Sequence, residues 1–419
     1  MQLNNFLEFK KRETLLLILL FLFSFLVRIP VIIILGDTAI ENEWNWLLYN
    51  LINHKVLSLG EHATSVGQGT ITFDGFLLPN LWMPPLYAYY LYVFSFFNLE
   101  NQSFVLLILF SQILLASVSV SIFYKINKLF FSQKISFYSS FIFSIFPIYL
   151  YACSQISSAS LTIFLAMFFY YYFFKIASNS KFIYIFLFAV TAGLLILVRR
   201  EFIAIIVLSS LYLFFYYKIP FKKIFLIILI SLITTSPYLV RNYLIFERII
   251  IQSAFGYNLW KGNNPHTNVE GFAVVDESLQ DQIDKIPRDK FYKINEDKLF
   301  FNEAVKNIKN DPKKYLILYF KKAISYFFID INSTKPNYYN PLHYFPIILL
   351  GITTLMGVFL SNKKSYHFNY LILVLVFYIS TFSIFAIQPR YKLFIIPLQI
   401  ILSNIFIDHA LKKIFHHRS

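Results

Sequence analysis

The sequence predicts an all-α integral membrane protein, built as a bundle of about ten transmembrane helices. Its 419 residues are 58% hydrophobic and only 14% charged, and the mean hydropathy is +0.60. Apolar runs, many of them about 16 to 22 residues long, recur along the chain, and a helix needs about 20 such residues to cross a bilayer. A soluble core of this length does not need so much apolar surface, and the alternation typical of barrel strands is not visible.

The first apolar run, residues 15–35, predicts the first span. Lys10, Lys11 and Arg12 precede it, so we expect it to enter the membrane from the cytoplasm. The run is too long for the core of a signal peptide and has no clear small-residue cleavage site. Arg28 interrupts it, and because a buried cation is costly in hydrocarbon, we expect a structural ion pair there rather than substrate contact.

A long segment, residues 36–102, follows the first span. Residues 41–57 have the pattern of an amphipathic helix, and Trp44 and Trp46 are typical of a membrane interface. Residues 84–97 leave only about 14 apolar positions after the proline, which is short for a crossing. We therefore predict interfacial helices in this first outer loop.

The lysines of the next loops set the predicted topology. Placing three basic loops in the cytoplasm satisfies the positive-inside rule and requires one crossing, residues 103–124, before the first of them. The basic loops carry Lys125, Lys128 and Lys134, then Lys175 and Lys181, then Lys218, Lys222 and Lys223. The later spans are predicted at residues 135–152, 156–174, 182–198, 202–217, 224–240, 342–360, 370–387 and 393–410.

This pattern divides the chain into three parts. Residues 1–240 form an N-terminal membrane module that contains the first outer loop (36–102). Residues 241–341 form a long outer, periplasmic segment, with a helix predicted at 296–309 and an interfacial helix at 315–329. Residues 342–419 form the C-terminal membrane helices and a basic cytoplasmic tail. Both termini are then cytoplasmic.

Composition excludes several classes of function. The net charge of +15 comes from loops beside membrane segments, and no basic stretch stands apart from them, so nucleic acid is not a predicted partner. Cys153 is the only cysteine, which excludes disulfides within the chain and cysteine-based metal sites. No acid–histidine spacing predicts a metal centre, so no metal ligands are assigned, and a divalent metal is left open as a cofactor.

Carboxylates gather directly after the first span. The stretch GDTAIENEW (residues 36–44) places Asp37, Glu41 and Glu43 close to the predicted outer membrane surface. Such a group is either an ordinary wet loop or a cluster of catalytic acids at the mouth of a membrane-embedded site. The charges in the rest of the chain favour the second interpretation.

Arginines occupy the outer side against the usual loop bias. They are Arg199 and Arg200 between two spans, Arg241 at the start of the outer segment, and Arg390 in a short outer connection. Any one of them could pair with a nearby acid or a lipid head group. Several at one membrane level, facing an acid-bearing loop, favour a grip on a phosphate, because the planar guanidinium matches phosphate geometry.

A carboxylate above a phosphate clamp predicts transfer from a lipid-linked phosphate. With a polyprenyl-phosphate sugar as donor, the lipid phosphate leaves and the arginines stabilise its growing charge. A carboxylate takes the proton of the acceptor hydroxyl as it attacks the sugar carbon, and one such base suffices for inversion. No glycine-rich phosphate loop is present, so a soluble nucleotide donor is not predicted.

Four stretches resemble the GT-C superfamily of membrane glycosyltransferases, specifically bacterial relatives of the protein O-mannosyltransferases and of the lipid A aminoarabinose transferase. They are GDTAIENEW (36–44), MPPLYAYYLYVF (83–94), SPYLVRNYLIFERIIIQSAFGYNLWKGNNP (236–265) and QPRYKLFIIPL (388–398). LVRREF (197–202) resembles the arginine-bearing turn of the family. Together they span most of the chain in the order found in the family.

The resemblance implies an inverting, hexosyltransferase-type enzyme that uses a polyprenyl-phosphate sugar at the periplasmic face of the bacterial inner membrane. It implies that Asp37 is the first-loop acid, with Glu43 as the nearest match for the second acid and Glu41 as its competitor. The loop CSQISSAS (153–160) lacks the acid that relatives often carry there, which puts a second carboxylate and metal binding in doubt. By their motifs, the implied lipid-phosphate contacts are Arg199, Arg200, Arg241 and Arg390, with weaker help from Tyr391, Asn242 and Asn258.

The acceptor implied by this interpretation is a cell-surface glycan, lipid or protein, and the other partners are the lipid-linked donor and membrane lipids. Two alternatives stay open. An O-antigen polymerase or ligase, which uses pyrophosphate-linked donors, would also carry outer arginines and a long outer loop. A transporter or flippase for lipid-linked sugars would carry membrane cations too, but it predicts acids near mid-membrane and repeated halves.

Overall fold

The described part of the protein is mainly helical, as the sequence predicts. The computed structural model describes residues 2–59, 72–73, 76–77, 79–330, 332–333, 341–361 and 365–416. Within these residues the only sheet is an antiparallel pair, β1 (Thr72–Phe73) and β2 (Phe76–Leu77), in the first outer loop. The predicted interfacial helices of that loop are present as α2 (Asn42–His54) and α3 (Pro85–Ser95), which pack against each other.

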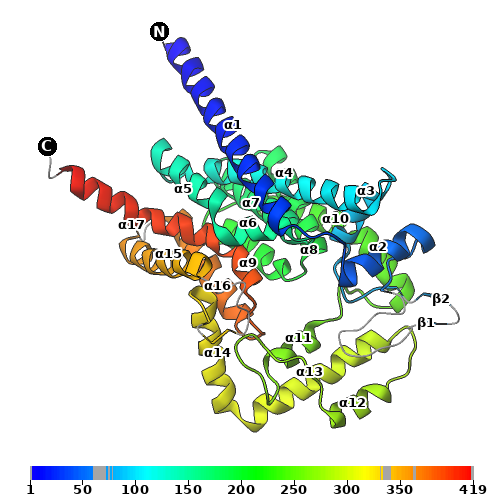
Figure 1. Ribbon diagram of the computed structural model, residues 1–419. Coiled ribbons are helices and arrows are strands. Elements are labelled where there is room, and N and C mark those ends of the chain that lie inside the picture. Colours follow the sequence, from blue (N-terminus) through cyan, green and yellow to red (C-terminus); the bar gives the residue numbers. More distant parts are fainter. Residues whose placement is uncertain are drawn as a thin grey trace.

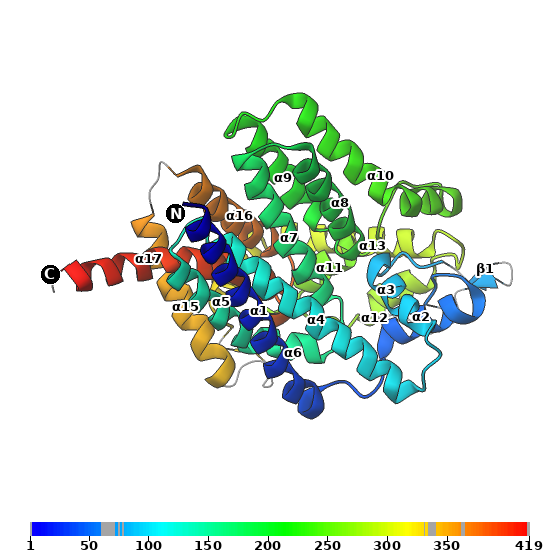
Figure 2. The same ribbon diagram turned by 90° about the horizontal axis from the view of Figure 1, so that it is seen from above.

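The N-terminal module is a bundle in which α1 packs on α4, α5 and α6, and α4 packs on α7 (Figures 1 and 2). A second layer follows, because α8 packs on both α7 and α10. The helices are α1 (Gln2–Leu35), α4 (Asn101–Asn127), α5 (Gln133–Ile145), α6 (Pro147–Ser154), α7 (Ala159–Ser178), α8 (Phe182–Val198), α9 (Phe202–Phe215) and α10 (Phe221–Phe246).

The long outer segment and the C-terminal helices complete the fold. In the outer segment α11 packs on α13, and at the C-terminus α15 packs on α17. The elements are α11 (Phe255–Gly262), α12 (Glu277–Asp284), α13 (Tyr292–Asn310), α14 (Pro312–Phe327), α15 (Pro341–Leu360), α16 (Tyr366–Phe382), the 3₁₀ helix η2 (Pro389–Phe394) and α17 (Ile396–His416).

Each of the ten predicted spans is helical. Among the described residues, five helices are long and apolar enough to cross a membrane by length and composition, or six if α5 and α6 together form one span: α1 from Arg12, α4, α7, α10 and α15. The helices α8, α9 and α16 are apolar but shorter. Many apolar side chains of the apolar helices are exposed, among them Ile233 of α10 and Phe359 of α15, as expected for helices that face lipid.

Two predicted boundaries are corrected. The single span predicted at 135–152 is two helices, α5 and α6, bent by 48°. The bend lies at Phe146, because the residue before a proline is disfavoured in helical geometry and Pro147 begins the next helix. The span predicted to end at residue 240 continues as α10 to Phe246, so Arg241 lies on a helix and not at the start of a loop.

The expected ion pair of Arg28 is absent. This side chain is only 1% exposed, yet in the described chain no carboxylate lies within ion-pairing distance of it. It donates instead to the carbonyl of Ser24, one turn earlier in α1, at 2.8 Å, and to the Ser24 hydroxyl. The prediction was wrong because the side chains facing α1 at this level are hydroxyls, aromatic rings and a thiol.

Both termini lie at the upper left of Figure 1, and α11, α12 and α13 lie at the opposite end of the bundle. We call that opposite end, which also carries α2 and the end of α1, the distal face. Asp37 follows α1, and Arg199 follows α8, while Arg241 lies in the last turns of α10. The fold therefore places them at one end of the bundle.

Candidate active site

Asp37 is fixed at the distal end of α1 by the turn between α6 and α7. Its backbone N–H donates to the carbonyl of Ser154 at 3.0 Å, and its Oδ2 accepts from the backbone N–H of Ile156 at 2.6 Å. The side chain of Gln155, between these two residues, donates to the Leu35 carbonyl at 3.0 Å. The half-buried carboxylate is therefore held in one orientation, as a group that acts on a bound substrate must be.

Burial raises the pKa of the Asp37 carboxyl, the Ile156 N–H opposes this effect, and the negative charge of Glu41 raises the pKa further. A carboxyl with a raised pKa is a better proton acceptor when ionised than an ordinary aspartate. Glu41 is exposed at the N-cap of α2, and Glu43 is half-buried in its first turn. Of the two candidates for a second acid, Glu41 is thus the one whose charge reaches Asp37.

Gln112, which the sequence reasoning missed, organises the polar layer beside Asp37. It lies in the middle of α4 with no exposed surface, accepts from the Tyr87 hydroxyl at 2.9 Å, and donates to the carbonyls of Cys153 and Gln155 at 3.4 and 3.0 Å. It thereby supports the turn that holds Asp37. A lone glutamine inside an apolar run is a sequence signal that could have pointed to it, since an amide in a span needs partners.

Arg199 and Arg390 lie around one aromatic ring. The guanidinium of Arg199 is 6.0 Å and that of Arg390 is 5.8 Å from the centre of the Tyr391 ring, so the two cations are no more than about 12 Å apart. Arg199 also lies over Phe394 at 5.0 Å and pairs with Glu201 at 3.1 Å, while its Nε has no partner. Arg390 is exposed. These two predicted arginines are brought to one ring, where Arg199 is paired with Glu201 and Arg390 is exposed.

Arg241 is used differently, because it donates to the backbone of the first outer loop. Its amino groups donate to the carbonyls of Asn80 and Leu57 at 3.3 and 3.2 Å, and to the amide oxygen of Asn242 at 2.6 Å. Asn242 in turn donates to the Ile250 carbonyl at 2.6 Å. This group holds the loop onto α10 by its carbonyl oxygens.

Arg200 is also connected to the first outer loop, through the side chain of Gln252. It donates to the carbonyl of Gln252 at 2.5 Å, and the Gln252 side chain donates to the carbonyl of Trp82. Asn258 donates to the Ala254 carbonyl of its own helix at 2.6 Å. The predicted phosphate contacts thus fall into two groups: Arg199, Arg390 and Tyr391 in one, and the loop-holding residues in the other.

The helix α6 connects the turn that holds Asp37 to η2, which carries Arg390 and Tyr391. Ser154 at its end accepts from Asp37, and the hydroxyl of Tyr149 near its start donates to the Leu393 carbonyl of η2 at 2.6 Å. Tyr149 and Ser154 are five positions apart, which corresponds to about 8 Å along a helix. The carboxylate and the cations are therefore at opposite ends of one short rigid element.

Comparison with solved structures gives likenesses over almost the whole chain. An oligosaccharyltransferase of Archaeoglobus fulgidus tethered to an acceptor peptide matches with a TM-score of 0.55 at 12% identity, over 96% of this chain and 50% of that one. The same organism's AglB in complex with an inhibitory peptide and a dolichol-phosphate matches with a TM-score of 0.53 at 11% identity, over 96% and 51%. ArnT of Cupriavidus metallidurans bound to undecaprenyl phosphate matches with a TM-score of 0.51 at 10% identity, over 94% and 60%.

The chain has the GT-C fold. It spans about half the length of the oligosaccharyltransferases that it matches. No family model and no curated protein matches the sequence, so the likeness is one of structure. At these identities it shows the fold, and the chemistry has to be argued from the residues of this chain.

Within this GT-C fold, the motif GYNLWKGNNP docks the outer segment onto the loop that carries Arg390. Asn263 donates to the carbonyls of Leu259 and Ile384 at 2.8 Å each, and Lys322 of α14 donates to the Gly262 carbonyl at 2.5 Å. Burial lowers the pKa of the Lys322 ammonium to about 7. The motif therefore has a structural role: it fixes the position of the loop before η2.

Metal ligands are not found in the described part of this GT-C fold, where no group of three or more histidine, cysteine, aspartate and glutamate side chains is close enough to hold an ion. The chemistry available to the described residues is that of a fixed carboxylate and two cations beside a tyrosine ring.

Proposed function

We propose that the chain is an inverting glycosyltransferase that moves a sugar from a polyprenyl-phosphate donor to a cell-surface acceptor, at the periplasmic face of the bacterial inner membrane. The observation that carries the proposal is the placement of Asp37, whose carboxylate is held by the Ile156 N–H at the distal end of a GT-C bundle. The acceptor is a glycan, lipid or protein with a free nucleophilic group. The orientation rests on the basic loops at the other end of the bundle.

In the proposed reaction the oxygen of the acceptor hydroxyl attacks the anomeric carbon of the sugar. The bond between that carbon and the phosphate oxygen breaks, and the polyprenyl phosphate leaves with the bonding electron pair. Asp37 takes the proton of the hydroxyl as the new glycosidic bond forms. The single displacement inverts the configuration at the sugar carbon, and it needs only one carboxylate.

Arg199 and Arg390 are the groups that we propose for the lipid phosphate. Both lie at the Tyr391 ring, where the guanidinium of Arg390 is exposed and the side chain of Arg199 is 17% exposed. Charge that grows on the leaving phosphate is stabilised by such preorganised cations. Arg241 acts through the first outer loop, whose carbonyls at Leu57 and Asn80 it holds, and Arg200 is connected to that loop through Gln252. Asn242 accepts from Arg241. They position Asp37 and its neighbours and do not need to touch the donor.

The test is mass spectrometry of surface glycans and lipids from the native host, with redundant enzymes deleted. Asp37→Asn keeps the shape of the side chain but removes the base, so we expect loss of one sugar-sized mass from the product at equal protein abundance in the membrane. Asp281→Asn is the matched control, because Asp281 is exposed on α12. It should leave the product unchanged.

Full transfer by Asp37→Asn would remove Asp37 from the catalytic role. The size of the missing product separates the alternatives: one sugar supports the proposal, whereas whole repeat units indicate a polymerase or ligase with pyrophosphate-linked donors. A profile that does not respond to any of these substitutions would favour a transporter, and a lipid-flipping assay would then be the next measurement.

A further inference from the structure

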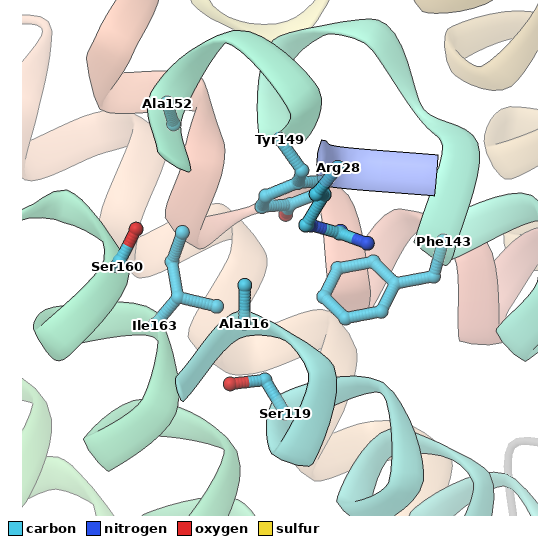
Figure 3. Close-up of a pocket in the computed structure, with 8 residues that line it drawn as sticks. All are labelled: Arg28, Ala116, Ser119, Phe143, Tyr149, Ala152, Ser160 and Ile163. Carbon is cyan, nitrogen blue, oxygen red and sulfur yellow. The ribbon is translucent and has the colours of Figure 1, made fainter. Parts of the chain in front are cut away.

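Two features of the described structure lie outside the candidate active site. One is a cavity inside the bundle, lined by Arg28, Phe143 and Ser160 among others (Figure 3). It has room for about one water molecule, which would serve the polar groups there, so it points to no other ligand. The other is an exposed apolar side of α14, which points to a partner.

The helix α14 carries this apolar stripe along its length. Leu316, Ile317, Phe320 and Ile324 are between 48% and 62% exposed, and they recur at intervals of about one turn on the same side of the helix. The opposite side is buried, with Tyr315, Leu318, Lys322, Ser325 and Tyr326 facing the protein. A contiguous exposed apolar surface of this kind indicates an interaction surface.

The N-terminal end of α14 belongs to the outer segment. Lys314 donates to the carbonyl of Pro265 at 2.8 Å, and α14 follows α13 directly. Further along the helix, the hydroxyl of Tyr319 donates to the carbonyl of Ser380 at 3.0 Å, near the distal end of α16. The middle of α14 is therefore at the level where this apolar helix ends.

The C-terminal end of α14 lies much deeper. Gly351 is at the middle of the span α15, and an added Cβ there would be 2.6 Å from two ring carbons of Phe328, the residue that follows α14. The Phe327 carbonyl accepts from the side chain of Gln399 in α17 at 3.3 Å. From Tyr319 to Phe328 the chain advances about 13 Å, close to half of a hydrocarbon core of about 30 Å. A helix lying flat on the membrane would keep both ends at one level, whereas α14 leads from the distal face toward α15 and α16 (Figure 1).

The surroundings of the stripe identify lipid as its partner. Leu349 and Ile352 of α15, on either side of Gly351, are exposed too, so the stripe continues the lipid-facing surface of a span. Lys313 is exposed at the outer end of the stripe and Lys321 at its edge. Helix side chains lean toward the N-terminus, which is here the outer end, so the Lys321 ammonium can reach the head groups while its stem stays in the apolar layer.

We propose that α14 is inserted at an angle into the membrane leaflet on the distal side, with its apolar stripe against lipid acyl chains and its exposed lysines at the level of the head groups. This order of apolar and basic side chains matches the order of the lipid layers. The proposal does not rest on the proposed transfer reaction.

Insertion of α14 also sets the position of η2 relative to the membrane, because the inner end of α14 holds η2. The hydroxyl of Tyr326 donates to the Tyr391 carbonyl at 2.8 Å, and Lys392 donates to the Phe328 carbonyl. Arg390 and Tyr391 are thereby held at a fixed depth.

The test is site-directed spin labelling of the full-length protein in vesicles of phosphatidylethanolamine and phosphatidylglycerol. Single cysteines in a Cys153→Ser background carry the nitroxide. Its collisions with oxygen, which concentrates in the bilayer, are compared with those with a water-soluble nickel chelate. The ratio of oxygen to nickel collisions should rise from Ile317→Cys through Phe320→Cys to Ile324→Cys. Asn302→Cys, at an exposed position of α13, is the control at which nickel should dominate.

Three outcomes would overturn the proposal. Nickel collisions at Ile324→Cys as frequent as at the control would show that the stripe faces water. Equal ratios at the three stripe positions would show a helix that lies flat on the membrane. Few collisions with either reagent, together with dipolar broadening between labels, would show that a second copy of the chain covers the stripe.

Discussion

The carboxylate of Asp37 experiences effects of opposite sign, and they determine the pH range in which it can act as a base. Burial and the charge of Glu41 raise its pKa, while the Ile156 N–H lowers it. Transfer should therefore fail on the acid side at a pH above the ordinary aspartate value of about 3.9. Below its raised pKa the group is protonated and accepts no proton.

Removing the charge of Glu41 tests this reasoning. Glu41→Gln should lower the pKa of Asp37, because one like charge is lost, and the acid limb of the pH profile should then move to lower pH. The measurement is product formation in native membranes across pH, with Asp281→Asn as the control that leaves the limb in place. An acid limb that stays at the same pH would show that another group titrates.

Single residues were predicted from the sequence where their role is local. Asp37 was found because it follows the first apolar run directly, and the arginines were found because they oppose the loop bias. Their division into two groups was not predictable, since it depends on partners far away in the chain: Arg241 donates to Leu57, 184 residues earlier. Gln112 was missed for the same reason, because its partners, in α3 and in the turn after α6, lie far from it in the sequence.

At the scale of elements, α11 shows how a short helix fixes the position of a loop. Gly262 at its end lies against the loop before η2, and an added Cβ would be 2.6 Å from the backbone nitrogen of Ala386 and 2.7 Å from the carbonyl carbon of Phe385. Backbone atoms cannot move aside as a flexible side chain can. Gly262→Ala should therefore destabilise the protein by about 1–3 kcal/mol through overpacking.

The measurements for Gly262→Ala are denaturation and limited proteolysis. We expect a lower denaturation midpoint and faster proteolysis of the outer segment. The control is Asn302→Ala, at an exposed position of α13, which should change stability by no more than about 0.5 kcal/mol. If both variants unfold at the wild-type midpoint, α11 is not packed as tightly against this loop as the structure indicates.

Elements were predictable where a long apolar run dominates, and this is why each predicted span is mainly helical. The break between α5 and α6 was missed because the run is apolar on both sides of Phe146, although Pro147 was the available signal. The end of α10 was placed too early at residue 240, since the polar Arg241 and Asn242 read as the start of a loop. They stay helical because each finds partners on the distal face.

At the scale of the whole molecule, contacts between loops fix which loops share one end of the bundle. Lys128 pairs with Glu13 at 3.0 Å, and the ring of Phe130 contacts that of Phe368 at the start of α16, with 5.4 Å between their centres. The N-terminal end of α1, the loop after α4 and the start of α16 are therefore at one end. The positive-inside rule, which counts the short loops, assigns this end to the cytoplasm, since each short loop here carries lysines, such as Lys125, Lys128 and Lys134 in the loop after α4.

This assignment predicts how single cysteines react with a membrane-impermeant maleimide in intact spheroplasts. In a Cys153→Ser background, Ser278→Cys on the exposed face of α12 should label from outside, because α12 lies on the distal face. Lys413→Cys, exposed near the end of α17, should label only after the membrane is broken. The reverse pattern would place Asp37 in the cytoplasm, where the proposed periplasmic acceptor is absent. Labelling of both sites from outside would mean that the whole chain, with its N-terminus in the cytoplasm, crosses the membrane an odd number of times.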